Sequence, residues 1–371
     1  MIFRVLIIGG YGNFGSYISK TLAKESNIQI IVAGRSLKKS LQLIAKLDAI
    51  NPPEAAELDI QDNFAEKLIT VHPQIVIHTS GPFQAQGYAV AEACIQQGIH
   101  YIDLADGRDF VAGIERLNQQ ANEQCVLVVS GASSVPCLTS ALVDFYQTEF
   151  KRMDSLDYGV TTAQKTTRGL ATTAAILGYT GKAFKTLIHG KQKAIFGWQG
   201  LRLRQYKKLG WRFLSHCDVP DLALFPQRYP QLKTIQFYAG LELSLIHLTL
   251  WFLSGLVRLG IIRHLEKAAL LMLRISFLFD IFGSSASGFH LTLTGLGKKD
   301  EAKSLTFELT AKSGDGPYIP CMPAILMAKK IVKGDIKKYG AFPCMGFIDL
   351  DEYLNALAEL DINWEVMRSF N

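Results

Sequence analysis

Three glycines near the amino terminus have the spacing of a site for the pyrophosphate of a dinucleotide. Gly10, Gly12 and Gly15 follow an apolar, β-branched run and precede a helical pattern. Gly10 permits a tight turn, Gly12 lets the backbone approach the pyrophosphate, and Gly15 lets the helix pack closely on the strand. Backbone groups of Asn13 and Phe14 then lie at the positive end of the helix dipole, where an anion binds. A purely structural strand-to-helix turn is the alternative that this motif alone leaves open.

The end of the next strand indicates which dinucleotide is bound. A second apolar strand, 28–33, is followed by Gly34, Arg35 and Ser36, where an NAD-binding protein carries an acidic residue for the ribose 2′-hydroxyl. A carboxylate would repel a 2′-phosphate, whereas the Arg35 guanidinium and the Ser36 hydroxyl pair with one. We therefore predict NADP rather than NAD. The alternative is that Arg35 is an ordinary solvated cation beside a helix start.

The composition indicates a large core and argues against a nucleic-acid partner. The chain has 371 residues, 49% of them hydrophobic, and a net charge of +6, so about two domains are expected. Lys and Arg are scattered, and an anionic cofactor or a membrane surface accounts for the charge equally well. The six cysteines show neither CxxC pairing nor metal-ligand spacing with histidine, so we expect reduced thiols in a cytoplasmic protein and no metal site. Because the first strand begins at residue 3, no signal peptide is expected.

The order of strand and helix patterns predicts two domains of an α/β protein. Over residues 1–150 apolar strands alternate with helices, which favours a Rossmann-type, doubly wound parallel sheet with right-handed crossovers. Residues 151–319 contain five strand patterns, several of them alternating, so we expect a second α+β domain built on a mixed or antiparallel sheet, for substrate binding and dimerisation. The tail, 320–371, has helical patterns again and is expected to pack back on the first domain or to bridge the two domains.

Two apolar segments in the second domain form a helical hairpin pattern over 243–282. Each is 15 residues long, short of the roughly 20 that span a bilayer. One interpretation is a hairpin buried in the second domain or in a dimer interface. The other is a hairpin that lies on a membrane, with its basic turn at the headgroups. That turn carries Arg258, Arg263, His264 and Lys267.

Several short motifs resemble the NADP-binding domain of the saccharopine dehydrogenase family. They are residues 9–15 (Gly-Gly-Tyr-Gly-Asn-Phe-Gly), 33–36, 80–83, 93–94 with 98–106, and 131–136, with a weaker likeness at 313–320. The resemblance implies a Rossmann fold, NADP and hydride transfer. The hydrophobic middle of the chain looks more like the saccharopine dehydrogenase-like oxidoreductases, whose substrates are poorly defined, than like a true saccharopine reductase.

The loop after the fourth strand is expected to lie at the nicotinamide. In an open α/β sheet, ligands bind beyond the carboxyl ends of the strands, and Ser80, Gly81, Pro82 and Phe83 occupy that place. Gly81 allows close approach to a ring, Pro82 stiffens the loop, and Phe83 would cover one face of the nicotinamide. The alternative is a turn with a core phenylalanine.

Charged and aromatic residues complete the expected site. Asp59, at the end of the third strand, is placed near the adenine, with a helix cap as the alternative. Asp103, Asp106 and Arg108 follow the fifth strand. A carboxylate there would hold the carboxamide, order the loop or move a proton, unless it forms an Asp–Arg ion pair within the loop. Arg168 and Tyr318 are candidates for binding or protonating a substrate. We therefore predict Asp106, Tyr318 and Arg168 as catalytic residues and Asp59 and Asp103 as cofactor ligands.

These residues together predict an NADP-dependent oxidoreductase. It would transfer hydride to or from an imine, carbonyl or activated double bond of a small or lipidic substrate. The first alternative is an NADP-binding protein associated with a membrane or a partner, with little or no turnover. The second is a true saccharopine reductase. A homodimer and peripheral membrane contact are further expectations.

Overall fold

The computed structural model describes residues 2–370, which form two compact units. The first unit comprises the described residues up to Ala141 together with Tyr318–Tyr353. The second comprises Leu142–Pro317 together with the described residues from Leu354 onward. Each unit is built on its own seven-stranded sheet.

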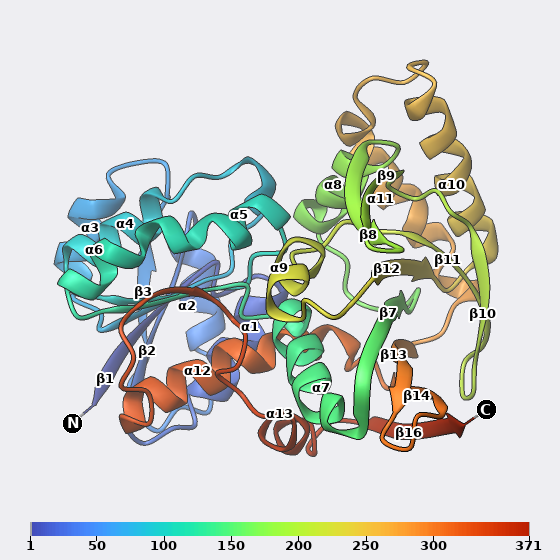
Figure 1. Cartoon of the computed structure of the whole chain (residues 1–371). Helices are drawn as coiled ribbons and strands as arrows, with labels where there is room; N and C mark the ends of the chain where they lie inside the picture. Colours follow the sequence, from blue (N-terminus) through green and yellow to red (C-terminus); the bar gives the residue numbers. More distant parts are fainter. Residues whose placement is uncertain (1, 371) are drawn as a thin grey trace. The chain divides into compact units, whose positions relative to one another are not determined.

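The first unit has the predicted parallel, doubly wound sheet (Figure 1). Its strand order is β15-β6-β5-β4-β1-β2-β3, and every pairing is parallel. The order changes direction at β1, so the carboxyl ends of β1 and β4 flank a switch point, where such sheets bind ligands. The strands are β1 (Phe3–Ile8), β2 (Ile28–Gly34), β3 (Glu54–Glu57), β4 (Ile75–His78), β5 (His100–Asp103), β6 (Leu127–Ser130) and β15 (Gly340–Pro343).

Helices cover both faces of this sheet, which explains the continuous apolar runs of its strands. Val5, Leu6 and Ile7 at the centre of β1 are fully buried, as expected for a parallel strand covered on both sides. Between β5 and β6 the chain forms two short helices, α5 and α6, separated by a 3₁₀ turn at Gly113–Leu117. The helices are α1 (Asn13–Leu22), α2 (Leu37–Ile44), α3 (Phe64–Val71), α4 (Ala89–Gln96), α5 (Arg108–Ala112), α6 (Asn118–Glu123) and α12 (Met322–Lys333), while α7 (Thr139–Tyr146) crosses into the second unit.

The second unit contains the expected mixed sheet. Its order is β10-β11-β12-β7-β13-β14-β16, in which β12 and β7 are parallel and the other neighbours are antiparallel. Its strands are β7 (Phe150–Thr162), β10 (Arg202–Tyr206), β11 (Gly210–His216), β12 (Thr234–Leu241), β13 (Ser287–Gly297), β14 (Ala302–Ala311) and β16 (Ile362–Phe370), and a separate hairpin is formed by β8 (Ala183–Ile188) and β9 (Lys191–Phe196).

The tail is shared between the two units. Residues 318–353 belong to the first unit, but β16 pairs with the edge strand β14 of the second sheet. Of the two expectations for 320–371, the division of the tail between the units agrees with the bridging one, and only its first part belongs to the first unit. Most side chains of β16 are exposed or half-buried, so the strand has little apolar alternation. Its main-chain hydrogen bonds hold it in place, and these leave no signal in the sequence.

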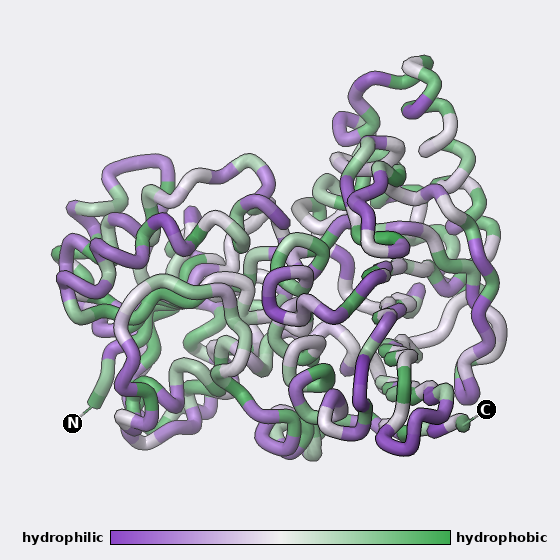
Figure 2. The backbone as a smooth tube through the Cα atoms, viewed as in Figure 1, coloured by the Kyte–Doolittle hydropathy of each residue, from purple (hydrophilic) through white to green (hydrophobic). Residues whose placement is uncertain are grey.

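The apolar segments predicted as a hairpin form α10 (Ser244–Arg258) and α11 (Ala269–Leu278), beside α8 (Leu170–Tyr179). One face of α10 turns inward through His247, Leu250 and Ser254. Leu250 packs in a small core with residues of α8 and with Trp198. Figure 2 shows hydrophobic stretches along both helices. No helix among residues 2–370 is long and apolar enough to cross a membrane.

Replacement of Gly15 by alanine tests the close approach of α1 to β1. A Cβ at Gly15 would overlap the backbone of Gly9 and lie 2.8 Å from the Cα of Gly10. We expect Gly15→Ala to lower the free energy of unfolding by about 1–3 kcal/mol, the cost of overpacking, in urea unfolding followed by circular dichroism. Gly87→Ala is the control, because a Cβ at Gly87 would have no heavy atom within 4 Å. Equal stabilities of the two variants would contradict this account of the turn.

Candidate dinucleotide site

The glycine turn between β1 and α1 leaves open backbone donors. A Cβ at Gly10 would lie 2.9 Å from the carbonyl oxygen of Ile7, so only glycine permits this turn. Gly12 caps α1 in an extended conformation without a side-chain hydrogen bond. Gly12 and Asn13 are exposed, and Phe14 is half-exposed. The first N–H groups of α1 are therefore free to bind an anion such as a pyrophosphate.

Tyr11, which the sequence analysis did not select, connects the glycine turn to the end of β2. A Cβ at Gly34 would lie 2.6 Å from the Tyr11 ring, so the ring rests directly on that glycine. The Tyr11 hydroxyl accepts a hydrogen bond of 3.2 Å from the N–H of Ser36, and the Lys39 ammonium lies 5.9 Å from the ring centroid. An aromatic residue inside the glycine motif was the available signal.

The end of β2 presents a cationic side chain beside a helix start. Arg35 is exposed and has no ion pair within residues 2–370. Ser36 is the N-cap of α2, and its hydroxyl accepts a weak 3.4 Å hydrogen bond from the N–H of Lys39. A free guanidinium next to N–H groups at a helix amino terminus is suited to a phosphate dianion. The predicted residues Arg35 and Ser36 therefore lie together as expected.

The loop after β4 reaches the glycine turn, but its phenylalanine points into the core. The Ser80 hydroxyl lies 2.5 Å from the place of a Cβ at Gly9. Gln86 ties the loop by donating to the carbonyl oxygens of Ser80, at 2.8 Å, and Pro82, at 3.1 Å. Phe83 is 4% exposed, with its ring centroid 5.3 Å from that of Phe110. In this conformation the Phe83 ring supports the loop and is not presented to a ligand.

The carboxylate of Asp103 connects the ends of β5 and β6 through hydrogen bonds. It is fully buried, and its Oδ1 accepts hydrogen bonds from the N–H groups of Ala105, at 2.9 Å, and Gly131, at 2.8 Å. The Ser130 hydroxyl donates to the same oxygen at 3.0 Å. Burial raises the pKa of Asp103 to about 6, although these donors oppose the rise. Asp103 therefore holds the loops after β5 and β6, which is one of the roles expected for it, and its contact with the carboxamide stays a prediction.

His78 and Tyr101 form a buried polar pair on the strands β4 and β5. The Nδ1 of His78 and the hydroxyl of Tyr101 are 3.0 Å apart, and both side chains are almost fully buried. Burial lowers the pKa of His78 to about 4, so the imidazole is neutral near pH 7. Both residues lie in apolar strands, where their positions look like ordinary core, so the sequence carries no signal for this pair.

Asp59 and Asp106, the other two carboxylates predicted for the site, differ in their surroundings. Asp59 accepts a hydrogen bond of 3.1 Å from the N–H of Gln61, which makes it a turn residue. Asp106 is exposed at the carboxyl edge of the sheet and accepts one of 3.1 Å from Gln84. Desolvation by surrounding protein atoms raises the pKa of Asp106. Asp106 is thus the predicted acid or base that keeps an open carboxylate.

The other two predicted catalytic residues have partners. The Tyr318 ring stacks on that of Tyr17 in α1, with centroids 4.1 Å apart, which places it beside the glycine turn. Arg168 lies in the second unit, donates to Asp280 at 2.5 Å and stands 4.7 Å from the Phe277 ring centroid. These contacts hold the guanidinium of Arg168 at the end of α11, and its role toward a substrate stays a prediction.

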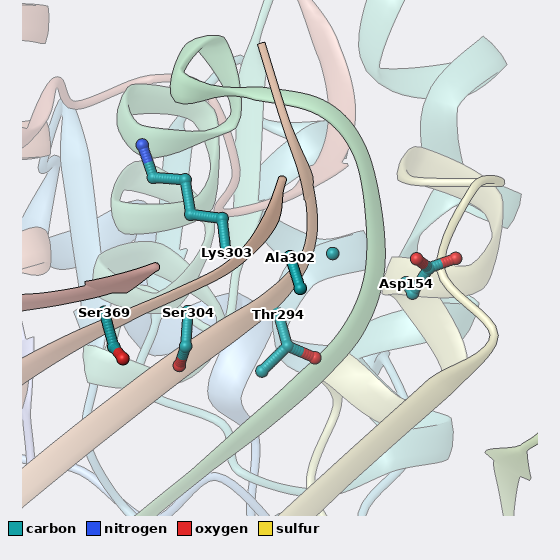
Figure 3. Close-up of a pocket in the computed structure, with 7 residues that line it drawn as sticks. Asp154, Thr294, Ala302, Lys303, Ser304 and Ser369 are labelled. Atoms are coloured by element: carbon teal, nitrogen blue, oxygen red, sulfur yellow. The ribbon is translucent and has the colours of Figure 1, made fainter. Parts of the chain in front are cut away.

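A hollow of about 320 Å³ opens on the sheet of the second unit (Figure 3). Its charged groups are already paired: Lys303 donates to Glu149 at 2.7 Å, and Asp154 binds Arg152 at 2.9 Å. The hollow therefore offers no free charge to a ligand. Its lining comprises Asp154, Thr294, Gly295, Ala302, Lys303, Ser304 and Ser369.

Comparisons with known proteins relate the first unit to a known type of domain. Residues 5–129 match the family model described as the saccharopine dehydrogenase NADP binding domain, which confirms the predicted resemblance and the NADP cofactor. A lipid droplet localized protein of Caenorhabditis elegans is 26% identical over 145 residues, covering 36% of this chain and 34% of the relative. The saccharopine dehydrogenase-like oxidoreductase of Bos taurus is 25% identical over 151 residues, covering 36% of this chain and 35% of the relative. These matches span about a third of each relative.

A solved structure has the same fold as this chain over almost its whole length. The saccharopine dehydrogenase (L-Glu forming) of Saccharomyces cerevisiae superposes with a TM-score of 0.68 at 12% identity, covering 98% of this chain and 100% of the yeast chain. At this identity the match shows the fold alone. It confirms the predicted combination of a parallel sheet with a second, mixed sheet.

The role of Asp103 is tested by the pH dependence of stability. Its raised pKa means that, from about pH 4 to 6, the folded state keeps a proton that the unfolded state releases. The stability of the wild type relative to Asp103→Asn should therefore fall by up to about 3 kcal/mol as pH rises through this window, and stay level above it. Urea unfolding at several pH values measures this difference. Parallel pH profiles of the two proteins would exclude a raised pKa at Asp103.

Proposed function

From the premise that residues 5–129 are a saccharopine dehydrogenase NADP binding domain, we propose that this chain is an NADP(H)-dependent oxidoreductase. The observation that supports it most directly is the free Arg35 guanidinium beside the start of α2, in the place where an NAD-specific site carries a carboxylate. Related sequences named saccharopine dehydrogenase-like oxidoreductase add support. The proposed reaction is hydride transfer with an imine, carbonyl or activated double bond.

The chain's own residues would position the cofactor and move one proton. When bound, NADPH supplies the hydride. The open N–H groups of α1 would bind the pyrophosphate, and Arg35 and Ser36 the 2′-phosphate. Asp103 would keep the loops at the nicotinamide end in place without touching the reacting atoms. The pKa of Asp106 is raised, which moves it toward neutral pH. Asp106 would exchange the proton that accompanies hydride transfer.

Cofactor choice gives the first test. Arg35→Asp should weaken NADPH binding by about 1.5–3 kcal/mol, or roughly 10- to 150-fold, because a charge-assisted contact is lost. NADH binding should change little, since NADH lacks the 2′-phosphate. Isothermal titration calorimetry with both cofactors measures the effect, and Lys24→Asp, an exposed site elsewhere in the same unit, is the control. Equal losses for NADPH and NADH would mean that Arg35 does not contact the 2′-phosphate.

Turnover gives the second test. NADPH oxidation is followed with a panel of imines, semialdehydes and enoyl thioesters, and NADP reduction with saccharopine. We expect turnover with at least one of them, and a 10²- to 10⁴-fold lower kcat for Asp106→Asn, the usual range for loss of an acid or base. Asp109→Asn, an exposed carboxylate close by in α5, should retain activity. Tight NADPH binding without turnover on any member of the panel would refute the proposed activity.

A second function is favoured by the apolar surface of α10 and α11. Large hydrophobic side chains are exposed there, and one relative carries the name lipid droplet localized protein. The chain would then be an NADP-binding protein that works at a lipid surface or on a partner, with little or no turnover. The turnover panel separates it from the first proposal. If the panel shows NADP reduction with saccharopine alone, the protein is a true saccharopine reductase. A homodimer stays a prediction.

A further inference from the structure

Helix α10 leaves one apolar face uncovered. Leu245, Phe252 and Leu259 follow one another at intervals of seven residues, so they lie along the same side of the helix, and all three are more than half exposed. The opposite side, with His247 and Leu250, is buried in the second unit. The helix therefore packs one side in the second unit and leaves large apolar side chains on the opposite side uncovered.

Helix α11 and the turn that follows it continue the uncovered surface. Leu271, Ile275, Leu278 and Phe282 have helical spacing of four, three and four residues. Leu278 and Phe282 are exposed by 72% and 70%, and the neighbouring Ile281 by 76%. Exposed apolar side chains gathered in this way mark an interaction site on a protein surface.

The uncovered surface is held in a defined position. The amide of Gln164 donates to the carbonyl oxygen of Ser276 at 2.8 Å and to Asp280 at 2.9 Å. Arg168 binds the same carboxylate. The exposed faces are thus carried on a fixed hairpin, whose end is anchored by Asp280, and are not a frayed segment.

The turn beside the apolar surface has a net positive charge. It carries Arg263 and Lys267, which have no ion pair among the described residues, and Arg258 ends α10. Its acid, Glu266, lies 3.0 Å from the Nδ1 of His264, a contact that is an ion pair only when the imidazole is protonated, and Asp280 is bound by Arg168. Three cations against one carboxylate leave the turn positive.

We propose that the surface of α10 and α11, defined by Leu245, Phe252, Leu259, Leu271, Ile275, Leu278, Ile281 and Phe282, docks on an anionic lipid surface. The apolar side chains would enter the boundary between headgroups and acyl chains, while Arg258, Arg263 and Lys267 face the lipid phosphates. The helices lie on the surface and do not cross it. A positively charged turn complements an anionic lipid surface, whereas a second copy carries the same charge and offers it no such complement.

The test is co-sedimentation of the full chain with vesicles. Vesicles of phosphatidylcholine with 30% phosphatidylglycerol are compared, at about 0.1 M salt, with vesicles of phosphatidylcholine alone. We expect binding to the anionic vesicles only. The variant Leu278→Glu/Phe282→Glu should lose it, whereas Ile69→Glu, at a 54% exposed site on α3 of the first unit, should retain it.

A charge variant tests the electrostatic part. Each basic side chain near an anionic surface strengthens binding about fivefold, so Arg258→Gln/Arg263→Gln/Lys267→Gln should weaken it by about 100-fold. Circular dichroism verifies that each variant is folded. Absence of wild-type binding, or equal binding to both kinds of vesicle, would overturn the proposal. The proposal would also be overturned if the wild type did not bind vesicles but formed dimers, and if Leu278→Glu/Phe282→Glu made these dimers dissociate. These outcomes are independent of NADPH binding and of turnover.

Discussion

The close approach of helix α1 to strand β1 is the constraint on which the cofactor site depends. Gly15 touches the backbone of Gly9, and Gly10 touches that of Ile7, so neither position has room for a side chain. This contact aims the amino terminus of α1 at the carboxyl edge of the sheet. The site also comprises the cationic end of β2 and the loop after β4. Both are placed around the amino terminus of α1 and its free N–H groups.

Buried polar contacts extend this arrangement to the neighbouring strands. Tyr11 joins the glycine turn to the N–H of Ser36, and Asp103 joins the ends of β5 and β6 through Gly131 and Ser130. A carboxylate with three donors on one oxygen fixes the loops on both sides, and removal of it would leave buried donors without partners. The edge of the sheet is therefore ordered before any ligand arrives, which lowers the entropic cost of binding.

The sequence was sufficient where local pattern and local structure coincide. The glycine spacing, the apolar strands and Arg35 predicted the first unit and its cofactor end, because each depends on residues close together in the chain. The sequence could not decide the contacts of a side chain where these depend on a distant partner. Arg168 is bound by Asp280, which lies 112 residues away, and Phe83 is packed against Phe110. Strand β16 is placed by main-chain pairing with β14, and pairing of that kind leaves no compositional mark.

The basic character of the chain divides into two kinds of site that respond differently to salt. At the proposed 2′-phosphate site one guanidinium and N–H groups at a helix start would contact the anion directly, so most of their interaction survives screening. The charges at the turn between α10 and α11 would act on a surface over several ångströms through water, and such attraction falls off within a Debye length. Raised ionic strength should therefore release the chain from an anionic surface while the cofactor stays bound. The apolar side chains of α10 and α11 set the affinity that remains, because burial of apolar area is insensitive to this screening.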